Sequence, residues 1–420
     1  MDTQNPWWSG NSDHVYEEWE GSEVRWTPAI VERLRTRPFS LHFLFGPRQV
    51  GKTTALKLLV RKELEERDPY SILYYSCDEL TGHEELGAVL DDYISARNAR
   101  NIKGSLILLD EVTMVDGWWR AVKARVDRGM FSKDTLIVTG SASMELLKQR
   151  ELFPGRRGHG EDHLMLPLSF GEYARTVGGL DVKTGGVEAL ARNADANTMH
   201  RSRLRELLDA YLTTGGFPRS VKDHASAGHV SQGTMKACLD WARGDWAKVG
   251  RSDSYMKEVL AYILRARGTP ISWNGISSET SINSPHTARS YVETLEGLFM
   301  TISLPLLAAN GKVEHKKNRK VHLTDPLLYT VFSKYAGCEV LGETILEATV
   351  ASHVARSATP YYWRNGRGEV DVVCKGKGGT YGLEVTASRK KRPFKPFHIK
   401  KMFILDRDTA PAHIAALGTS

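Results

Sequence analysis

Short apolar runs alternate with segments of helical periodicity from residue 39 to about residue 170. A continuous apolar run of five or six residues is typical of a strand that is buried on both faces. Alternation of such strands with helices predicts a parallel sheet that is covered by helices. The predicted strands are residues 40–45, 70–76, 105–110, 134–139 and 163–167. We therefore expect an α/β domain over residues 39–177, preceded by an N-terminal extension, residues 1–38.

The pattern changes beyond residue 177. Residues 178–200 are rich in Gly, Asn, Asp and Thr, a composition typical of a flexible connection. Apolar positions with helical spacing follow in residues 204–212 and 235–246, and Gly215-Gly216-Phe217-Pro218 is expected to end the first of these helices. This stretch predicts a helical lid over residues 178–253.

The next segment, residues 254–335, has the order of elements of a winged-helix domain. Its predicted helices are residues 255–265, 276–280 and 288–298, and its predicted strands are 299–304 and 320–323. A basic tip between the strands would contain Lys312, Lys316, Lys317, Arg319 and Lys320. A helix-turn-helix with a basic hairpin suits duplex DNA. A protein contact, or a lysine-rich tip that only meets solvent, remains an alternative.

The last segment, residues 336–420, predicts a small α/β domain with a helix at 341–354 and strands at 361–364, 369–374, 381–385 and 401–405. Strand alternation places Glu369 and Asp371 on one face, and Glu384 lies near the end of the next strand. Carboxylates that converge on a sheet edge can bind magnesium and support metal-assisted cleavage of a phosphodiester.

Candidate chemistry is densest just after the first predicted strand, where a glycine-flanked loop leads into a helix. The loop reads G-x-x-x-x-G-K-T, the Walker A pattern, and its strand–loop–helix context supports the match. Backbone N–H groups of such a loop cradle phosphates, and the lysine and threonine serve the β- and γ-phosphates and Mg²⁺. These residues are expected to bind ATP: Gly46, Pro47, Arg48, Gln49, Val50, Gly51, Lys52, Thr53 and Thr54.

The third predicted strand ends in two acids, Asp110 and Glu111, as a Walker B motif does. We expect Asp110 to hold Mg²⁺ together with Thr53, and Glu111 to orient the attacking water. The sequence therefore predicts a MgATP site with Lys52 and Glu111 as catalytic residues.

Two further polar positions are candidates for the same site. The fourth strand ends at Thr139, and either Thr139 or Ser141 can sense the γ-phosphate, unless this is an ordinary strand-to-turn transition. A later loop carries Arg156 and Arg157 between glycines. Arg156 is expected either to supply an arginine finger to a neighbouring subunit of a homo-oligomer or to lie in a solvated basic turn.

Composition narrows the class of protein. The chain has 420 residues, 41% of them hydrophobic, and no apolar stretch long enough to span a membrane. Its four separated cysteines, and an N-terminus without a signal pattern, favour a cytoplasmic protein. The net charge of +7 permits a polyanionic partner. The tryptophans of residues 1–38 are expected to cap the α/β domain, with peptide binding as the alternative.

The order of these motifs resembles a known family. The Walker residues, Thr139-Gly140-Ser141, Leu166-Pro167-Leu168-Ser169-Phe170 and the Gly215-Gly216-Phe217-Pro218 stretch together resemble the prokaryotic AAA+-like ATPases of the AAA_14 type. Those proteins carry a C-terminal domain of unknown function, DUF4143. The resemblance implies a P-loop NTPase sheet, a helical lid, a winged helix and a terminal domain similar to restriction-endonuclease-like PD-(D/E)xK folds. It also implies that the nuclease-like acids are Glu347, Asp371 and Glu384.

One position departs from an active nuclease pattern. The expected Glu-x-Lys reads Glu384-Val385-Thr386, so the lysine that would stabilise developing charge is missing there. A lysine from Arg389-Lys390-Lys391-Arg392, or Lys400 or Lys401, can replace it, but an inactive domain kept for nucleic-acid or protein contact is the favoured interpretation. The leading hypothesis is an ATPase that couples nucleotide state to DNA binding. An ATP-gated nuclease and a nucleotide-regulated protein scaffold are the alternatives.

Overall fold

A five-stranded parallel sheet lies at the centre of the first of two units in the computed structural model, Met1–Leu166 and Pro167–Ser420. The structure describes residues 1–140, 143–365, 368–386, 396 and 398–418. The strand order is β2-β3-β4-β1-β5. All five predicted strands are confirmed, as β1 (Ser40–Phe45), β2 (Ile72–Ser76), β3 (Leu106–Asp110), β4 (Thr135–Thr139) and β5 (Asp162–Leu164).

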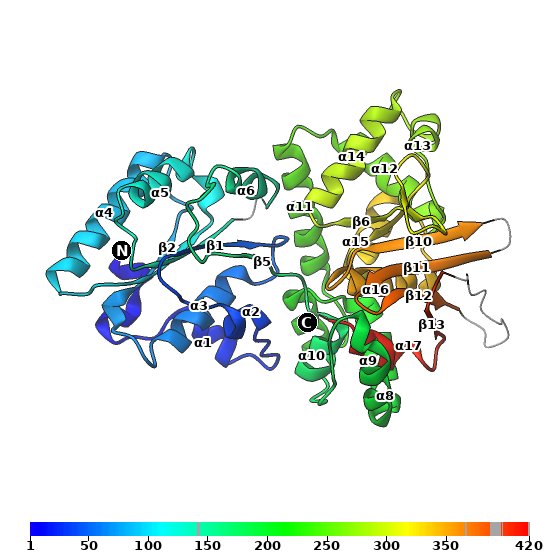
Figure 1. The fold of residues 1–420 in the computed structure, drawn as a ribbon, viewed down its shortest axis with the longest axis horizontal. Coiled ribbons are helices and arrows are strands. Elements are labelled where there is room, and N and C mark those ends of the chain that lie inside the picture. Colours follow the sequence, from blue (N-terminus) through cyan, green and yellow to red (C-terminus); the bar gives the residue numbers. More distant parts are fainter. Residues whose placement is uncertain (141–142, 366–367, 387–395, 397, 419–420) are drawn as a thin grey trace. The chain divides into compact units, whose positions relative to one another are not determined.

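Helices cover both faces of this sheet, as the parallel arrangement requires. Figure 1 shows α4 and α5 on one face, and α1, α2 and α3 on the other. The α-helices of this unit are α1 (His14–Glu20), α2 (Ala29–Arg33), α3 (Lys52–Glu63), α4 (His83–Ala99), α5 (Trp118–Asp127) and α6 (Ser143–Arg150). Short 3-10 turns are η1 (Asp2–Gln4), η2 (Pro6–Ser9), η3 (Pro69–Ser71) and η4 (Val112–Met114).

The N-terminal extension closes the edge of the sheet at β2. The indole N–H groups of Trp7 and Trp8 both donate to the carbonyl of Ile72, at 3.2 and 3.0 Å. The ring of Trp8 also stacks on Tyr70 and Tyr93. These contacts confirm the prediction that the N-terminal tryptophans cap the α/β domain, because they cover an edge strand whose carbonyls need partners.

The second unit combines helices with a six-stranded mixed sheet. Its sheet has the order β13-β12-β11-β10-β7-β8, and β6 pairs separately with β9. Figure 1 shows α12, α13 and α14 gathered at one end of this unit, and α8, α9 and α17 at the other. The strands are β6 (Thr301–Leu304), β7 (Leu306–Leu307), β8 (Val313–Glu314), β9 (Lys320–Leu323), β10 (Pro360–Asn365), β11 (Gly368–Gly376), β12 (Gly379–Val385) and β13 (Lys401–Leu405).

The helices of the second unit include every helix predicted there and add α7, α8, α10, α15 and α17. They are α7 (Phe170–Thr176), α8 (Leu190–Asn197), α9 (Arg201–Thr214), α10 (Pro218–Ala227), α11 (Gln232–Lys248), α12 (Asp253–Ala266), α13 (Trp273–Glu279), α14 (Pro285–Gly297), α15 (Pro326–Ala336), α16 (Gly342–Ala355) and α17 (Ala410–Ala416). Two 3-10 turns, η5 (Val187–Ala189) and η6 (Thr198–His200), flank α8.

The prediction of a flexible connection at residues 178–200 is wrong, because this stretch contains α8 and both turns. The side chain of Asn197 accepts from the backbone N–H of Lys183 at 2.7 Å and donates to its carbonyl at 3.0 Å. A backbone bridge also joins Gly185 to Leu417. Polar residues that are usual in loops are thus used here to fasten a connection against the C-terminal helix, α17.

The basic tip predicted between residues 304 and 320 contains strands that the sequence did not predict. The strand pair β6 and β9 exists, but the chain between them forms β7 and β8, and Leu306 pairs with Tyr362 of β10. Strands from the predicted winged-helix segment therefore belong to the same sheet as strands from the predicted C-terminal domain. Sequence periodicity cannot reveal this, because it carries no information on which strands pair.

Two motifs of the family resemblance lie against each other in the second unit. The N–H of Leu168 donates to the carbonyl of Gly216 at 2.8 Å. The carboxylate of Asp325 accepts from the N–H groups of Gly216 and Leu327, each at 2.9 Å. Gly215 has φ +65°, and a Cβ there would lie 1.8 Å from Asp325 Oδ1. Only glycine fits this position, so this motif has a structural role.

Candidate functional site

The phosphate loop leaves β1 and ends where α3 begins at Lys52. Gly46 has φ +152°, and a Cβ on it would come within 2.1 Å of the carbonyl oxygen of Met165 beside β5. Gly51, at φ +89°, turns the chain directly into the helix. These two glycines let the backbone curl around a phosphate-sized space at the positive end of a helix dipole.

Lys52 is held inside this loop. Its side chain is only 6% exposed, and its ammonium donates to the carbonyls of Gly46 and Pro47 at 3.0 Å each. A buried ammonium within a loop of backbone N–H groups is suited to bind the oxygens of a polyphosphate.

Thr53 and Asp110 meet beside the loop, as the predicted metal site requires. The Thr53 hydroxyl donates to Asp110 Oδ2 at 2.6 Å, and the Tyr74 hydroxyl donates to the same oxygen at 3.0 Å. Asp110 is 1% exposed, and this burial raises the pKa of its carboxyl. A hydroxyl and a carboxylate are the hard oxygen ligands that Mg²⁺ prefers, so the residues present fit the expected ion.

Glu111 follows in a left-handed backbone conformation, at φ +55° and ψ +35°. A non-glycine residue in this region is uncommon and costs of order 1 kcal/mol or more. Such strain concentrates at functional sites, which agrees with the predicted role of Glu111 in orienting water.

Thr139 lies between the two Walker strands, because β4 separates β3 from β1. It pairs in register with Leu44, and the preceding residue, Val138, pairs with Leu109. Its hydroxyl is buried and has no hydrogen-bond partner among the described residues. The role of Thr139 as a γ-phosphate sensor remains a prediction. The alternative sensor, Ser141, lies outside the described residues.

Arg156 lies at the other edge of the sheet. Its neighbours along the chain contact the start of β1, where the N–H of Leu41 donates to the carbonyl of Arg157. The phosphate loop begins at the end of β1, roughly 17 Å away at about 3.3 Å per residue. The guanidinium of Arg156 pairs with Asp127 at 2.5 Å. Arg156 is therefore remote from the phosphate loop of its own subunit.

The N-terminal extension forms a wall of the cavity beside Asp110 and Glu111. This cavity has a volume of about 510 Å³. Lys57, one turn after Thr53 on α3, pairs with Asp13 of the extension at 2.9 Å and lies 3.4 Å from the centre of the Tyr74 ring. Sequence reasoning missed Lys57 and Tyr74, since only the fold brings them to the Walker residues. The cavity is lined by Thr3, Gln4, Pro6, Ser12, Asp13, His14, Val15, Thr53, Lys57, Tyr74, Ser76, Asp78, Asp110 and Glu111.

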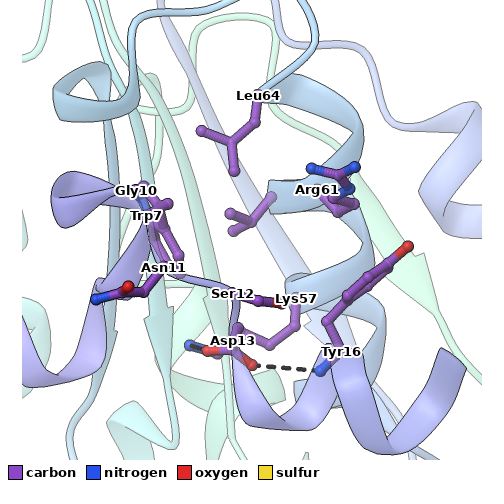
Figure 2. Close-up of a pocket in the computed structure, with 10 residues that line it drawn as sticks. Trp7, Gly10, Asn11, Ser12, Asp13, Tyr16, Lys57, Arg61 and Leu64 are labelled. Carbon is purple, nitrogen blue, oxygen red and sulfur yellow. Dashed lines mark hydrogen bonds and ion pairs between the residues drawn. The ribbon is translucent and has the colours of Figure 1, made fainter. Parts of the chain in front are cut away.

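A smaller pocket lies on the other side of the same contact (Figure 2). Figure 2 shows Trp7, Asp13 and Tyr16 of the extension facing Lys57 and Arg61 of α3. The Asp13 carboxylate accepts from the N–H groups at the start of α1 and so caps that helix while it pairs with Lys57. The extension is thus fastened to α3, the helix that carries Thr53, the expected magnesium ligand.

The second unit brings two of the three nuclease-like acids together, but around an unexpected residue. Glu347 and Asp371 both contact the ammonium of Lys320, at 2.7 and 3.1 Å. Glu369 is the third carboxylate, at 2.6 Å. Continuing the β11–β12 register by one residue places Glu384 opposite Asp371, on the same face.

The assignment of Lys320 to a basic DNA-binding tip is wrong, since its side chain is 1% exposed. The basic residues next to Lys320 in the sequence suggested that it belongs to the same exposed tip. Lys312, Lys316 and Lys317 are exposed, as expected of a tip. The run Arg389-Lys390-Lys391-Arg392 lies outside the described residues, and Lys400 donates to the carbonyl of Gly378.

Comparison with known proteins agrees with the P-loop site. Residues 39–174 match the AAA_14 family model, described as an AAA domain. Together with the parallel sheet and the two Walker motifs, this match identifies an AAA-type P-loop ATPase domain. Residues 205–336 match a second model, a domain of unknown function, DUF8612. The motifs had instead suggested a C-terminal DUF4143 domain, and the similarity of that domain to a nuclease fold remains a prediction.

Two curated relatives are known only as uncharacterized proteins. One, from Haemophilus influenzae, is 26% identical over 227 residues, which cover 52% of this chain and 50% of that protein. The other, from Methanocaldococcus jannaschii, is 26% identical over 191 residues, or 44% of this chain and 39% of that protein. The chain therefore spans half the length or less of the curated relatives it matches.

Among solved structures, the chain is similar to a Walker-type ATPase of Pyrococcus abyssi, with 15% identity and a TM-score of 0.44 over 76% of this chain and 93% of that one. It is also similar to the Aeropyrum pernix ORC2 protein in ADPNP–ADP complexes, with 13% identity and a TM-score of 0.41 over 71% and 88% of the two chains. Within the described part of the chain, no helix is both long and apolar enough to cross a membrane.

Proposed function

We propose that the protein binds and hydrolyses MgATP at the phosphate loop and that the nucleotide controls binding of duplex DNA by the second unit. Hydrolysis of MgATP is supported by the hydrogen bond between Thr53 and Asp110, which lies beside the buried Lys52. Phosphoryl transfer depends mostly on positioning and charge stabilisation, and this arrangement supplies both.

The roles of the residues follow from their positions. Lys52 and the loop N–H groups bind the β- and γ-phosphates, and Glu111 orients a water for attack on the γ-phosphate. Mg²⁺, held by Thr53 and Asp110, would neutralise charge on the phosphate oxygens. The Thr139 hydroxyl, which lies between the Walker strands, donates to the γ-phosphate or to the attacking water.

A complete site also needs a positive charge on the far side of the γ-phosphate. Because Arg156 is remote from its own phosphate loop, it would act only in trans, on the site of a second copy of this chain. The proposal therefore includes a homo-oligomer that is competent for hydrolysis, and a dilute monomer that turns over slowly.

DNA binding is supported by the charge on the loop between β8 and β9. Lys316 and Lys317 are exposed there, while α12, α13 and α14 form the helices expected of a helix-turn-helix. Exposed lysines beside such helices contact phosphates and confer a binding affinity that falls steeply with salt.

The test is steady-state ATP turnover with Mg²⁺ at low salt, with and without duplex DNA, with Lys52→Ala as the blank. Stimulation by DNA that disappears as salt rises supports the full proposal. ATP turnover that does not change when DNA is added supports hydrolysis alone. It favours the alternative in which the nucleotide controls a protein partner. An absence of turnover above the blank contradicts the hydrolysis.

The DNA interface has its own control. Lys316→Glu with Lys317→Glu should weaken duplex binding by roughly tenfold or more and reduce its salt dependence by about two phosphate contacts. Lys222→Glu with Lys236→Glu reverses two exposed charges on α10 and α11 of the same unit and should leave the affinity nearly unchanged. Equal effects of the two double variants would show that net charge, not this loop, determines binding.

A further inference from the structure

Lys320 is a buried lysine surrounded by acids. It lies on β9 and is 1% exposed. Its ammonium contacts Glu369 Oε1 at 2.6 Å, Glu347 Oε1 at 2.7 Å and Asp371 Oδ1 at 3.1 Å. Burial alone would lower the pKa of Lys320, but the three carboxylates outweigh it and raise the pKa above the usual range of a lysine. Lys320 is therefore charged at neutral pH.

The carboxylates come from two elements that hold them in place. Glu347 is on α16, which packs on β11, and Glu369 and Asp371 are alternate residues of β11. The second oxygen of Asp371 accepts from the N–H of Val385 on the next strand, at 2.9 Å. The other oxygen of Glu369 lies 3.4 Å from Arg364 Nε. The oxygens that face Lys320 are thus oriented by contacts on their far sides.

The cluster has more negative than positive charge. Three carboxylates face one buried ammonium, and the nearby Arg364 is more than half exposed and so strongly screened. Burial, with Asp371 nearby, raises the pKa of Glu347 to about 7. Such an excess of carboxylate around one point is what a divalent cation, rather than a monovalent ammonium, would balance.

A second observation points to the same position. His322, two residues after Lys320 on β9, is fully buried, and neither of its ring nitrogens has a hydrogen-bond partner among the described residues. Its Nε2 lies 3.5 Å from Glu347 Oε1. Burial, followed by the charge of Lys320, lowers the pKa of His322 to about 3, so the ring is neutral. A neutral imidazole is a common metal ligand, and that of His322 is directed at the carboxylate cluster.

The spacing of the oxygens supports this interpretation. They lie 2.6–3.1 Å from the Lys320 nitrogen, whereas oxygen ligands lie at about 2.0–2.1 Å from Mg²⁺ and about 2.3–2.6 Å from Ca²⁺. A contraction of about half an ångström to one ångström would bring them to metal-ligand distances. Within the described residues, no group of three or more acids, histidines or cysteines is arranged to hold a metal.

We propose that Glu347, Glu369 and Asp371 form a divalent-cation site in which the Lys320 ammonium takes the place of the cation. In the native chain the ammonium occupies the position of the cation, and no metal is bound there. Substitution of Lys320 by an uncharged residue opens a site for a hard divalent cation, with oxygen ligands from α16 and β11.

The experiment uses the full chain and Mn²⁺ as the probe. Lys320→Met removes the charge but keeps an apolar stem of similar length. In nucleotide-free protein, 1 mM Mn²⁺ should raise the melting temperature of Lys320→Met by roughly 5 °C or more, if the ion is present at about a hundred times its dissociation constant. The melting temperature of the wild type should change by about 1 °C or less.

Two controls locate the effect. Lys320→Arg keeps a cation in the cluster and should not respond to Mn²⁺. Lys320→Met combined with Asp371→Asn removes one ligand and should lose most of the Mn²⁺-dependent rise. Mn²⁺ bound at the phosphate loop contributes equally to all variants, so it cannot produce a difference among them.

Three outcomes would overturn the proposal. The first is a folded Lys320→Met variant that does not respond to Mn²⁺. The second is a wild type whose melting temperature rises with Mn²⁺ in a way that Asp371→Asn abolishes, since Lys320 then does not exclude the metal. The third is Mg²⁺-dependent DNA cleavage by the wild type that both Lys320→Met and Asp371→Asn abolish, since Lys320 would then be a catalytic lysine beside a bound metal. If Lys320→Met is unfolded without metal, Mn²⁺ should restore a cooperative unfolding transition, and failure to do so also counts against the proposal.

Discussion

Thr53, at the start of α3, and Asp110, at the end of β3, are 57 residues apart in the chain and share a 2.6 Å hydrogen bond. The bond joins the two predicted magnesium ligands directly. Thr53 directly follows Lys52, the residue that is expected to bind the phosphates, so the bond also brings Asp110 next to the start of α3.

Lys52→Ala should abolish ATP turnover. The substitution removes the charge that stabilises the β- and γ-phosphates, and we expect a loss of at least a hundredfold in kcat/KM. Lys62→Ala on the same helix is the matched control, because Lys62 is partly exposed and pairs only with Glu32 and the Val31 carbonyl among the described residues. Comparable losses in the two variants would mean that helix stability, not phosphate binding, was measured.

Tyr74→Phe should raise the Mg²⁺ concentration needed for half-maximal turnover by about tenfold or more. The Tyr74 hydroxyl donates to Asp110 Oδ2 and so fixes the rotamer of a metal ligand, and loss of such an outer contact typically costs 10-fold or more in metal affinity or activity. A Mg²⁺ titration of turnover at saturating ATP measures the change. Tyr75→Phe, on the neighbouring half-exposed residue, should leave the titration as in the wild type. A Tyr74→Phe titration that matches the wild type would contradict the positioning role.

Arg156→Ala tests action in trans. Since Arg156 is remote from its own phosphate loop, the variant should turn over slowly by itself and should recover when mixed with Lys52→Ala. In the mixture, the Arg156→Ala copy supplies an intact phosphate loop and the Lys52→Ala copy supplies the arginine. Each variant alone has one of the two groups and is expected to turn over slowly or not at all. Full activity of Arg156→Ala alone would show that the loop is a solvated basic turn held by Asp127.

His353 should make the stability of the second unit depend on pH. Its Nε2 accepts from the N–H of Phe170 at the start of α7, and burial lowers the pKa of His353 to about 3. The unfolded chain has a histidine pKa near 6.5, so it binds more protons than the folded chain between pH 6.5 and pH 3. Stability is therefore retained above pH 6.5 and lost as pH falls, by about 2 kcal/mol at pH 5 at about 1.4 kcal/mol per unit.

Denaturant unfolding of the wild type and His353→Gln between pH 7.5 and pH 4.5 measures this loss. Glutamine keeps an acceptor but does not titrate, so the variant should lose less stability across the range. Asp325 acts in the opposite direction, because burial raises its pKa to about 6 and favours the folded state as pH falls below that value. Parallel curves for the two proteins would show that His353 does not titrate on unfolding.

The phosphate site was largely predictable from the sequence because its residues are local. Nine consecutive residues carry the Walker A loop, and an apolar run that ends in Asp110 and Glu111 carries the second motif. Strand–loop–helix geometry forces such residues to the carboxyl edge of a parallel sheet. The five strands and the position of Thr139 at that edge follow from the same pattern, but the strand order that places β4 between the two Walker strands does not.

The sequence by itself thus determined the phosphate loop, the acids beside it and the alternation that builds the parallel sheet, because these depend on neighbouring residues and on periodicity. Only the tertiary structure decided that Tyr74 contacts Asp110 and that Lys57 lies in the same cavity. It also decided that β7 and β8 join the C-terminal sheet, and that Lys320 lies among acids instead of at a basic tip. The physical reason is that strand pairing and the burial of a charge are settled between segments far apart in the chain. A lysine has the same place in a sequence pattern whether solvent or three carboxylates surround it.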